Sequence, residues 1–173
     1  MDRWQCLNVG KRENSNKKEN VWDILRPTIC EPFNGSLMVV VSGKVIVKTD
    51  RGFRSLETSH PPIKYIPPDE INLDALLCNK RATLCEWKGK ASYFNFKVSN
   101  RNITDIAWTY TYPTPRFRKI KNYLSFYASK VDARYVNGEK VFAQNGDFYG
   151  GWIKKAWPCH LKEEKDRLIS NTK

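Results

Sequence analysis

The chain has 173 residues, 40% of them hydrophobic and 28% charged, which excludes wholesale disorder and predicts one domain with a sizeable core. The formal net charge is +12, and residues 91–135 hold eight lysines or arginines against two aspartates. This asymmetry favours an anionic partner, a nucleic acid or an acidic protein, although a solvated basic surface is an equal alternative. No apolar run approaches the about 20 residues of a membrane span, so no membrane partner is expected.

Five cysteines stand far apart in the chain, at positions 6, 30, 78, 85 and 159. The count is odd, and the polar amino terminus lacks the apolar region of a secretory signal. Free thiols and a cytoplasmic location are therefore expected.

Composition divides the chain into three parts. Residues 1–25 are polar and predict a flexible arm, in which Trp4 and Trp22 are candidate docking anchors. A single β-rich domain is expected over 26–160, followed by a charged tail over 161–173 that is a candidate helix.

Within the domain, alternating and β-branched segments predict a mainly β fold. Ser42-Gly43 and Asn137-Gly138 are expected to form tight hairpin turns. Residues 69–77 predict a short helix or turn, and residues 117–122 a short basic linker or turn. The predicted strands are 37–41, 44–48, 53–58, 91–98, 103–112, 123–127 and 131–136.

Several of these segments occur in an order that is similar to one known family. They are Leu56-Glu57-Thr58, Tyr65-Ile66-Pro67, the pattern Cys-x-x-Lys-Gly-x-Ala-x-Tyr over 85–93, and Trp108-Thr109-Tyr110. Over about 37–127 the chain resembles the domain-of-unknown-function family four-two-seven, which some catalogues label nucleotidyltransferase-like. The resemblance implies a small, strongly curved antiparallel sheet, barrel-like and of the β-tent type, with residues 128–160 as an extension.

Three residues in these segments are candidates for catalysis. Lys88 follows Cys85 by three positions, and a nearby amine lowers the pKa of a thiol and makes it a nucleophile. The alternative is an ordinary strand cysteine followed by a turn. Glu57, part of the resembled pattern, is expected to act as an acid or base, or to form a structural ion pair with Lys88 or Arg54.

Aromatic residues in the same segments are candidates for lining a ligand slot, with packing in the core as the alternative. No Cys-x-x-Cys pair is present and both histidines are isolated, so neither a metal site nor a cofactor is expected. The candidate ligand-binding residues are Tyr65, Trp87, Tyr93, Trp108 and Tyr110.

A basic cluster over 116–121 is a candidate for binding phosphates, with a solvated linker as the alternative. Its cations are Arg116, Arg118, Lys119 and Lys121. We therefore rank a domain that binds an unidentified small molecule first, with catalysis left open. A module that binds nucleic acid or an acidic partner is second, and a non-catalytic scaffold component is third.

Overall fold

The computed structural model describes residues 23–24, 26–58, 60–72, 74–98, 101–143 and 150–154. Trp4, Trp22 and the tail 161–173 lie outside these residues, so the docking arm, the scaffold role that depends on it and the terminal helix stay predictions.

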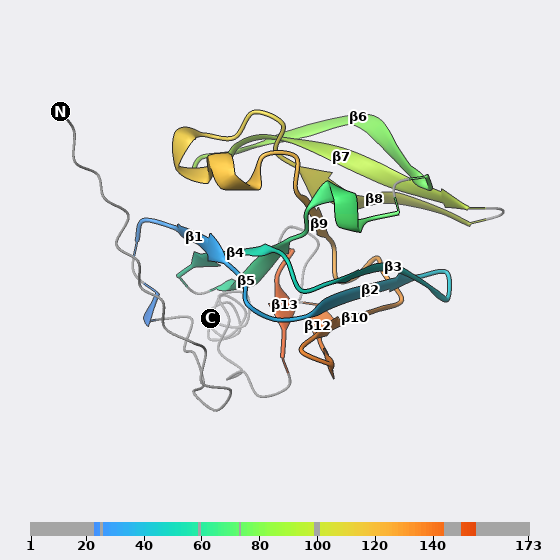
Figure 1. The fold of residues 1–173 in the computed structure, drawn as a ribbon. Coiled ribbons are helices and arrows are strands. Elements are labelled where there is room, and N and C mark those ends of the chain that lie inside the picture. The colour runs from blue at the N-terminus through green and yellow to red at the C-terminus, as the bar shows by residue number, and fades with distance from the viewer. Residues whose placement is uncertain are drawn as a thin grey trace, which may run out of the picture.

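The described residues form strands joined by short loops, which confirms the mainly β prediction (Figure 1). Two short 3₁₀ helices, η2 (Pro68–Glu70) and η3 (Pro115–Ile120), interrupt them. The strands are β1 (Ile29–Pro32), β2 (Leu37–Val41), β3 (Lys44–Thr49), β4 (Phe53–Glu57), β5 (His60–Tyr65), β6 (Leu76–Cys85), β7 (Gly89–Val98), β8 (Arg101–Thr109), β9 (Leu124–Phe126), β10 (Ala133–Val136), β11 (Glu139–Lys140), β12 (Phe142–Ala143) and β13 (Trp152–Ile153).

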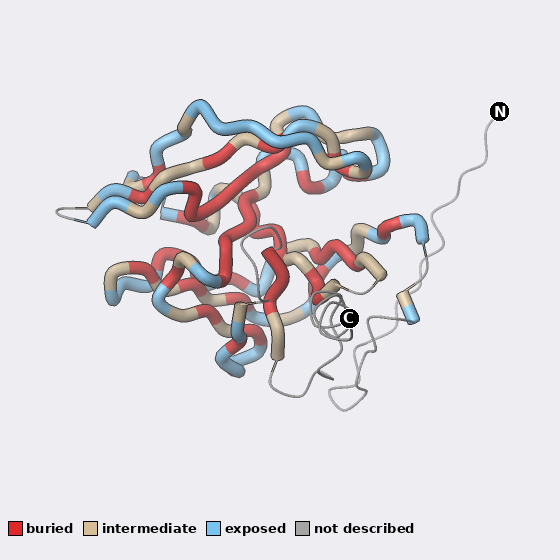
Figure 2. Tube along the Cα trace, turned by 180° about the vertical axis from the view of Figure 1, so that it is seen from behind, coloured by how far each residue is buried: buried red, intermediate tan, exposed pale blue. Residues whose placement is uncertain are grey.

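The strands are divided among four antiparallel sheets, and those of the described residues do not close into one barrel. The sheet β6-β7-β8-β9 forms the upper layer in Figure 1, above β11-β10-β2-β3 and β1-β4-β5, while β12 pairs with β13. The layers are joined where Ile66 and Leu124 exchange backbone hydrogen bonds of 2.8 and 2.9 Å. Exposed residues follow the outer strand β6 of the upper layer (Figure 2).

The two predicted hairpin turns are confirmed. Ser42 and Gly43 have φ angles of 52° and 71°, and Asn137 and Gly138 have φ angles of 55° and 77°. Two successive positive φ angles define a type I′ turn, whose twist matches that of the flanking strands. Asn137 also accepts a hydrogen bond of 2.9 Å at Oδ1 from the backbone N–H of Ser36.

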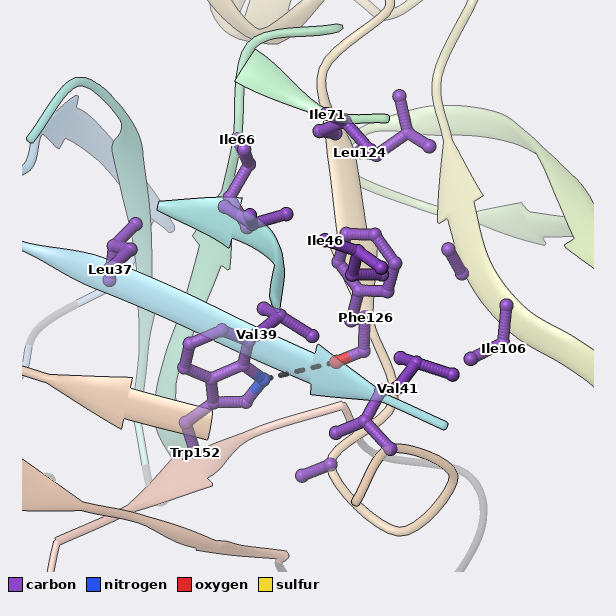
Figure 3. Packing of buried hydrophobic residues seen from close by; sticks show 14 of the residues in the cluster. Leu37, Val39, Val41, Ile46, Ile66, Ile71, Ile106, Leu124, Phe126 and Trp152 are labelled. Atoms are coloured by element: carbon purple, nitrogen blue, oxygen red, sulfur yellow. Dashed lines mark hydrogen bonds between the residues drawn. The ribbon is translucent and has the colours of Figure 1, made fainter. Parts of the chain in front are cut away.

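Two clusters of buried side chains make up the core. The larger one includes Val39, Val41 and Phe126, and Trp152 enters it with its indole N–H donating to the carbonyl of Phe126 at 3.0 Å (Figure 3). The smaller cluster is mainly aromatic and includes Tyr65, Tyr93, Trp108, Tyr110, Phe117 and Tyr127.

Three local predictions differ from the structure. The strand predicted over 103–112 ends at Thr109, and Tyr112 does not share the face of its buried neighbours, since it is 83% exposed. The helix predicted over 69–77 is limited to η2, because Leu76 already pairs with Phe96 in the sheet. The segment 117–122, predicted as a basic linker or turn, is more than a linker, because it includes most of η3, in which Phe117 and Ile120 are fully buried.

Candidate functional site

An ion pair between two distant segments forms the centre of the candidate site. Glu57 ends β4 and Lys88 lies in the turn between β6 and β7, where the Lys88 ammonium donates a hydrogen bond to Glu57 Oε1. The side chain of Lys88 is only 3% exposed and that of Glu57 is 25% exposed. Since an isolated ammonium is costly to bury, the carboxylate is what allows the amine to lie inside the protein.

The turn that carries Lys88 is fixed by Thr114. The Thr114 N–H donates to the carbonyl of Lys88 at 3.2 Å, and its hydroxyl donates to the carbonyl of Trp87 at 2.6 Å. Gly89 ends the turn with a φ of +95°, a conformation that residues with a Cβ rarely adopt. The lysine of the Cys-x-x-Lys-Gly pattern is therefore positioned by backbone contacts on both sides.

Among the described residues, the carboxylate of Glu57 is bonded through one of its two oxygens. Ser55 Oγ donates to Oε1 at 3.3 Å, and the Lys88 ammonium donates to the same atom. Oε2 accepts no hydrogen bond from the residues that the structure describes. The side chain of Glu57 is 25% exposed, so the carboxylate is not completely enclosed by protein.

Two tyrosines lie beside the ion pair, and their rings contact one another with centroids 6.4 Å apart. Tyr65 is fully buried, and its hydroxyl has no hydrogen-bond partner among the described residues. Burial raises the pKa of Tyr65 well above its usual value, with contributions from Tyr110 and Glu57. Burial also raises the pKa of Tyr110, with a contribution from the neighbouring Cys85. Both hydroxyls therefore stay protonated at neutral pH.

Cys30 of β1 joins the site, although the sequence analysis did not predict it there. Burial raises the pKa of its thiol to about 11, against the opposing charges of Lys88 and Lys119. Cys30 is therefore a thiol and no thiolate at neutral pH. Nothing in the sequence around Cys30 marks this position, because β1 reaches the site by pairing with β4.

The helix η3 borders the same site. The Lys88 ammonium lies 5.5 Å from the centroid of the Phe117 ring, and Lys119 is close enough to influence the pKa of Cys30. The residues buried in η3, Phe117 and Ile120, are three positions apart, which matches the repeat of a 3₁₀ helix. The four predicted anion-binding side chains stand before, between and after these two positions and are exposed: Arg116, Arg118, Lys119 and Lys121.

The predicted site residues fall into two neighbourhoods. Tyr93 and Trp108 belong to the same aromatic cluster as Tyr65 and Tyr110, but their direct partners lie elsewhere. The Tyr93 hydroxyl is hydrogen-bonded to Thr83 Oγ1 at 2.8 Å, and the Trp108 ring contacts Tyr127 in a tilted arrangement with centroids 4.5 Å apart. Glu57, Tyr65, Cys85, Lys88 and Tyr110 remain as one group, with the half-buried Trp87 packed against the same cluster.

A polar network in the upper sheet was also missed by the sequence analysis. Asn79 donates to Asn95 and Asp105 at 2.6 and 2.7 Å, and Arg81 donates to Asp105 at 2.6 Å. Burial by itself would raise the pKa of Asp105, but the hydrogen bonds from Arg81 and Asn79 hold that pKa below its usual value. The network lies where β6 and β7 both shift register, a feature that single-strand patterns do not reveal.

In a comparison with known proteins, the site falls within a region that matches a family model, but the match gives the site no role. The family model described as Domain of unknown function (DUF427) matches residues 29–137, a wider range than the expected 37–127. No curated protein matches the chain. No helix among the described residues is long and apolar enough to cross a membrane. Since the matched range covers more than half of the chain and includes Glu57, Lys88 and η3, the protein belongs to the DUF427 family.

Proposed function

We propose that the domain binds a small ligand at the Glu57–Lys88 pair, and that this ligand has both a hydrogen-bond donor and an anionic group. The observation that carries the proposal is the carboxylate of Glu57, which is held by Lys88 through Oε1 while Oε2 is left without a donor from the described residues. A ligand N–H or O–H group that donates to Oε2 would satisfy the second oxygen of the carboxylate. Cys30, Cys78 and Cys85 are free thiols, which supports a reducing, cytoplasmic setting for this binding.

Two further features support the same ligand chemistry. The buried Tyr65 hydroxyl has no hydrogen-bond partner in the described part of the chain, and an unsatisfied buried polar group costs about 1–3 kcal/mol. A polar ligand group, or a water held with the ligand, would remove that cost. The exposed Lys119 of η3, which influences the Cys30 thiol, provides a cation for the anionic group of the ligand.

An enzymatic role of this site would depend on Cys85 and Glu57. The Cys85 thiol lies near Tyr110 and is partly exposed, so it would be able to reach a bound ligand. Glu57 would accept the proton and Lys88 would keep the carboxylate in place. The second thiol, Cys30, is unsuited as a nucleophile because its pKa of about 11 keeps it protonated.

The binding proposal is tested by thermal denaturation of the protein with inorganic phosphate, sugar monophosphates, nucleoside monophosphates and amino acids. We expect at least one anionic compound to raise the Tm of the wild type, since a ligand at about 100 times its Kd stabilises by about 2.7 kcal/mol. Glu57→Gln should abolish this shift and Lys119→Gln should weaken it. Glu70→Gln is the matched control, because Glu70 forms an exposed ion pair with Arg51.

The proposal is wrong if no compound stabilises the wild type. It is also wrong if the stabilising compound acts equally on Glu57→Gln and on Glu70→Gln. A stabilisation that is lost in Lys119→Gln but kept in Glu57→Gln would move binding from the carboxylate to the surface of η3.

A second candidate function, binding of single-stranded nucleic acid through η3, is favoured by one observation. The exposed ring of Tyr112 lies beside the basic cluster, with the Lys121 ammonium 5.8 Å from its centroid. Cations that contact phosphates next to a ring on which bases stack are typical of proteins that bind single strands. An acidic protein would use the same cations but would gain little from the ring.

A fluorescent oligonucleotide titrated over a series of salt concentrations tests this second candidate. Binding should weaken steeply as salt rises, and the double variant Arg116→Gln/Arg118→Gln should reduce the slope by about one to two units. Tyr112→Ala should weaken binding without changing the slope. An affinity that is insensitive to salt, or unchanged in both variants, would exclude the surface of η3.

A further inference from the structure

A separate groove lies between the two layers and shares no lining residue with the Glu57–Lys88 site. It has a volume of about 280 Å³ and is lined by the β2–β3 hairpin, the segment before β6 and the end of β7. In Figure 1 the β2–β3 hairpin and the β7–β8 hairpin extend in the same direction, with β7–β8 above β2–β3. At about 30 Å³ per water molecule, the space corresponds to about nine waters, which suits a small ligand.

The base and walls of the groove are apolar. Val41, Ile46 and Phe96 are buried at 0%, 9% and 2% exposure, and they belong to the larger core cluster. Val45 is 54% exposed, and Val98 on the facing strand is half-buried. A hydrocarbon chain placed between Val45 and Val98 would remove this apolar surface from water, which is favourable by about 25 cal/mol per Å².

The polar rim of the groove carries more positive than negative charge. Lys44 and Lys97 are exposed, and neither forms an ion pair with any of the residues that the structure describes. The single acidic residue of the lining is Asp74, whose backbone N–H is bonded to Asn72 Oδ1 at 3.2 Å. The nearby Arg101 and Asp132 pair with one another at 2.8 Å and contribute no net charge.

We propose that this groove binds a medium-chain carboxylate. The hydrocarbon chain lies between Val45 and Val98 above Phe96, and the carboxylate lies between the ammonium groups of Lys44 and Lys97. Two cations against one anion favour this head group over an ammonium, and the apolar base favours a chain over a compact polar metabolite. The groove is independent of the ligand proposed for Glu57.

Titration of the ¹⁵N-labelled protein with octanoate, below the concentration at which octanoate forms micelles, tests the proposal. We expect saturable shifts of the amide signals of Val45, Lys97 and Val98. Lys44→Gln and Lys97→Gln should each weaken binding by about two- to fivefold, the usual range for one exposed charge. Asp74→Asn should tighten binding by a similar factor, and Lys80→Gln, an exposed lysine outside the groove, should leave it unchanged.

Several outcomes would overturn the proposal. Shifts that do not saturate would exclude specific binding in the groove. Shifts around Tyr65 and Lys88 instead would place octanoate at the Glu57 site. Equal binding of octylammonium would remove the role of the two lysines. Weaker binding of octanoate to Asp74→Asn would contradict the placement of its carboxylate at this rim, because removing a negative charge there should favour an anion.

Discussion

Lys88 and Glu57 are 31 positions apart in sequence, yet each determines whether the other can occupy its place. The ammonium is almost completely buried, whereas the carboxylate still touches solvent. The pair is therefore asymmetric, because among the described residues the carboxylate is the only charged partner of the buried lysine, whereas the carboxylate itself is partly exposed. The ligand proposed for this site would use the exposed part of Glu57.

We expect Lys88→Met to lower the free energy of unfolding by about 1–3 kcal/mol, because Glu57 loses a charged hydrogen-bond donor. The combined change Glu57→Leu/Lys88→Met should recover part of this loss, since no charge is then left near the aromatic cluster. Urea denaturation measures both. Glu70→Gln, which breaks an exposed pair, should cost no more than about 1 kcal/mol; an equal cost at the two pairs would contradict the burial argument.

The raised pKa of Cys30 gives a prediction about pH. At pH 8 the thiolate fraction of a group whose pKa is about 11 is about a hundredfold lower than that of a thiol with an ordinary pKa of 9.0, so iodoacetamide should alkylate Cys30 slowly. Mass spectrometry of peptides compares it with the exposed Cys78, which should react first.

The linked effect on stability follows from the direction of the shift. A group whose pKa is higher in the folded state stabilises the fold fully below the unfolded pKa, and this contribution is lost as pH rises from about 9 through about 11. Cys30→Ala should therefore flatten the fall in stability over this range. Rapid alkylation of Cys30 in the folded protein, or an unchanged pH profile of Cys30→Ala, would contradict the burial of its thiol.

At the scale of elements, the local signals in the sequence were reliable where two strands are joined by a short turn. Ser42-Gly43 and Asn137-Gly138 both predict tight hairpin turns, and both form type I′ turns, since the turn residues strongly favour that conformation. The segment of η3 was interpreted as a basic linker or turn because its three cations and the following Lys121 obscured the spacing of Phe117 and Ile120. The expected single curved sheet is divided among four sheets, a property of pairing between distant strands.

Part of the candidate site was also predictable from the sequence. Glu57, Cys85 and Lys88 lie in the segments that resemble the family, and the ion pair of Glu57 with Lys88 was one of the two alternatives stated for the carboxylate. Cys30 and the network around Asp105 were not predictable, because strand pairing and bulges bring their partners from other parts of the chain. Whether the site binds a ligand stays a prediction.

We expect Asn137→Ala to lower the free energy of unfolding by about 1–2 kcal/mol. The change removes a residue that tolerates a φ of 55° and also removes the acceptor of the Ser36 N–H. Asn137→Gly should cost less, because it keeps the backbone conformation and loses only the side-chain bond. Asn34→Ala, at an exposed position, is the control and should stay within about 0.5 kcal/mol. Equal costs for alanine and glycine would exclude the backbone contribution.

At the scale of the whole molecule, the folded unit is longer than the range that the family model matches. Trp152 follows the matched residues 29–137, yet it is 2% exposed and donates to the carbonyl of Phe126. Gly150 lies directly against Trp108, where a Cβ atom would come within 2.0 Å of the indole. Both clusters of the core therefore include contacts from the extension.

We expect Trp152→Ala to lower the free energy of unfolding by about 3–5 kcal/mol, the usual cost of removing a large buried aromatic side chain. Trp152→Phe should cost less, because most of the packing is kept and the bond to Phe126 is lost. Chemical denaturation followed by circular dichroism measures both changes. A cost below about 1 kcal/mol for Trp152→Ala would show that residues 29–137 suffice for the fold.

The positions of Trp152 and Trp108 also give the protein two built-in optical reporters. Trp152 lies in the larger, aliphatic cluster and Trp108 in the smaller, aromatic one, and each indole is shielded from water. Variants that retain one of these two indoles as the sole fluorophore would let the unfolding of each half of the interior be followed separately. Coincident fluorescence transitions would mean that the two clusters unfold together in one cooperative step. Separated transitions would mean that the aromatic cluster, with its ion pair, can unfold independently.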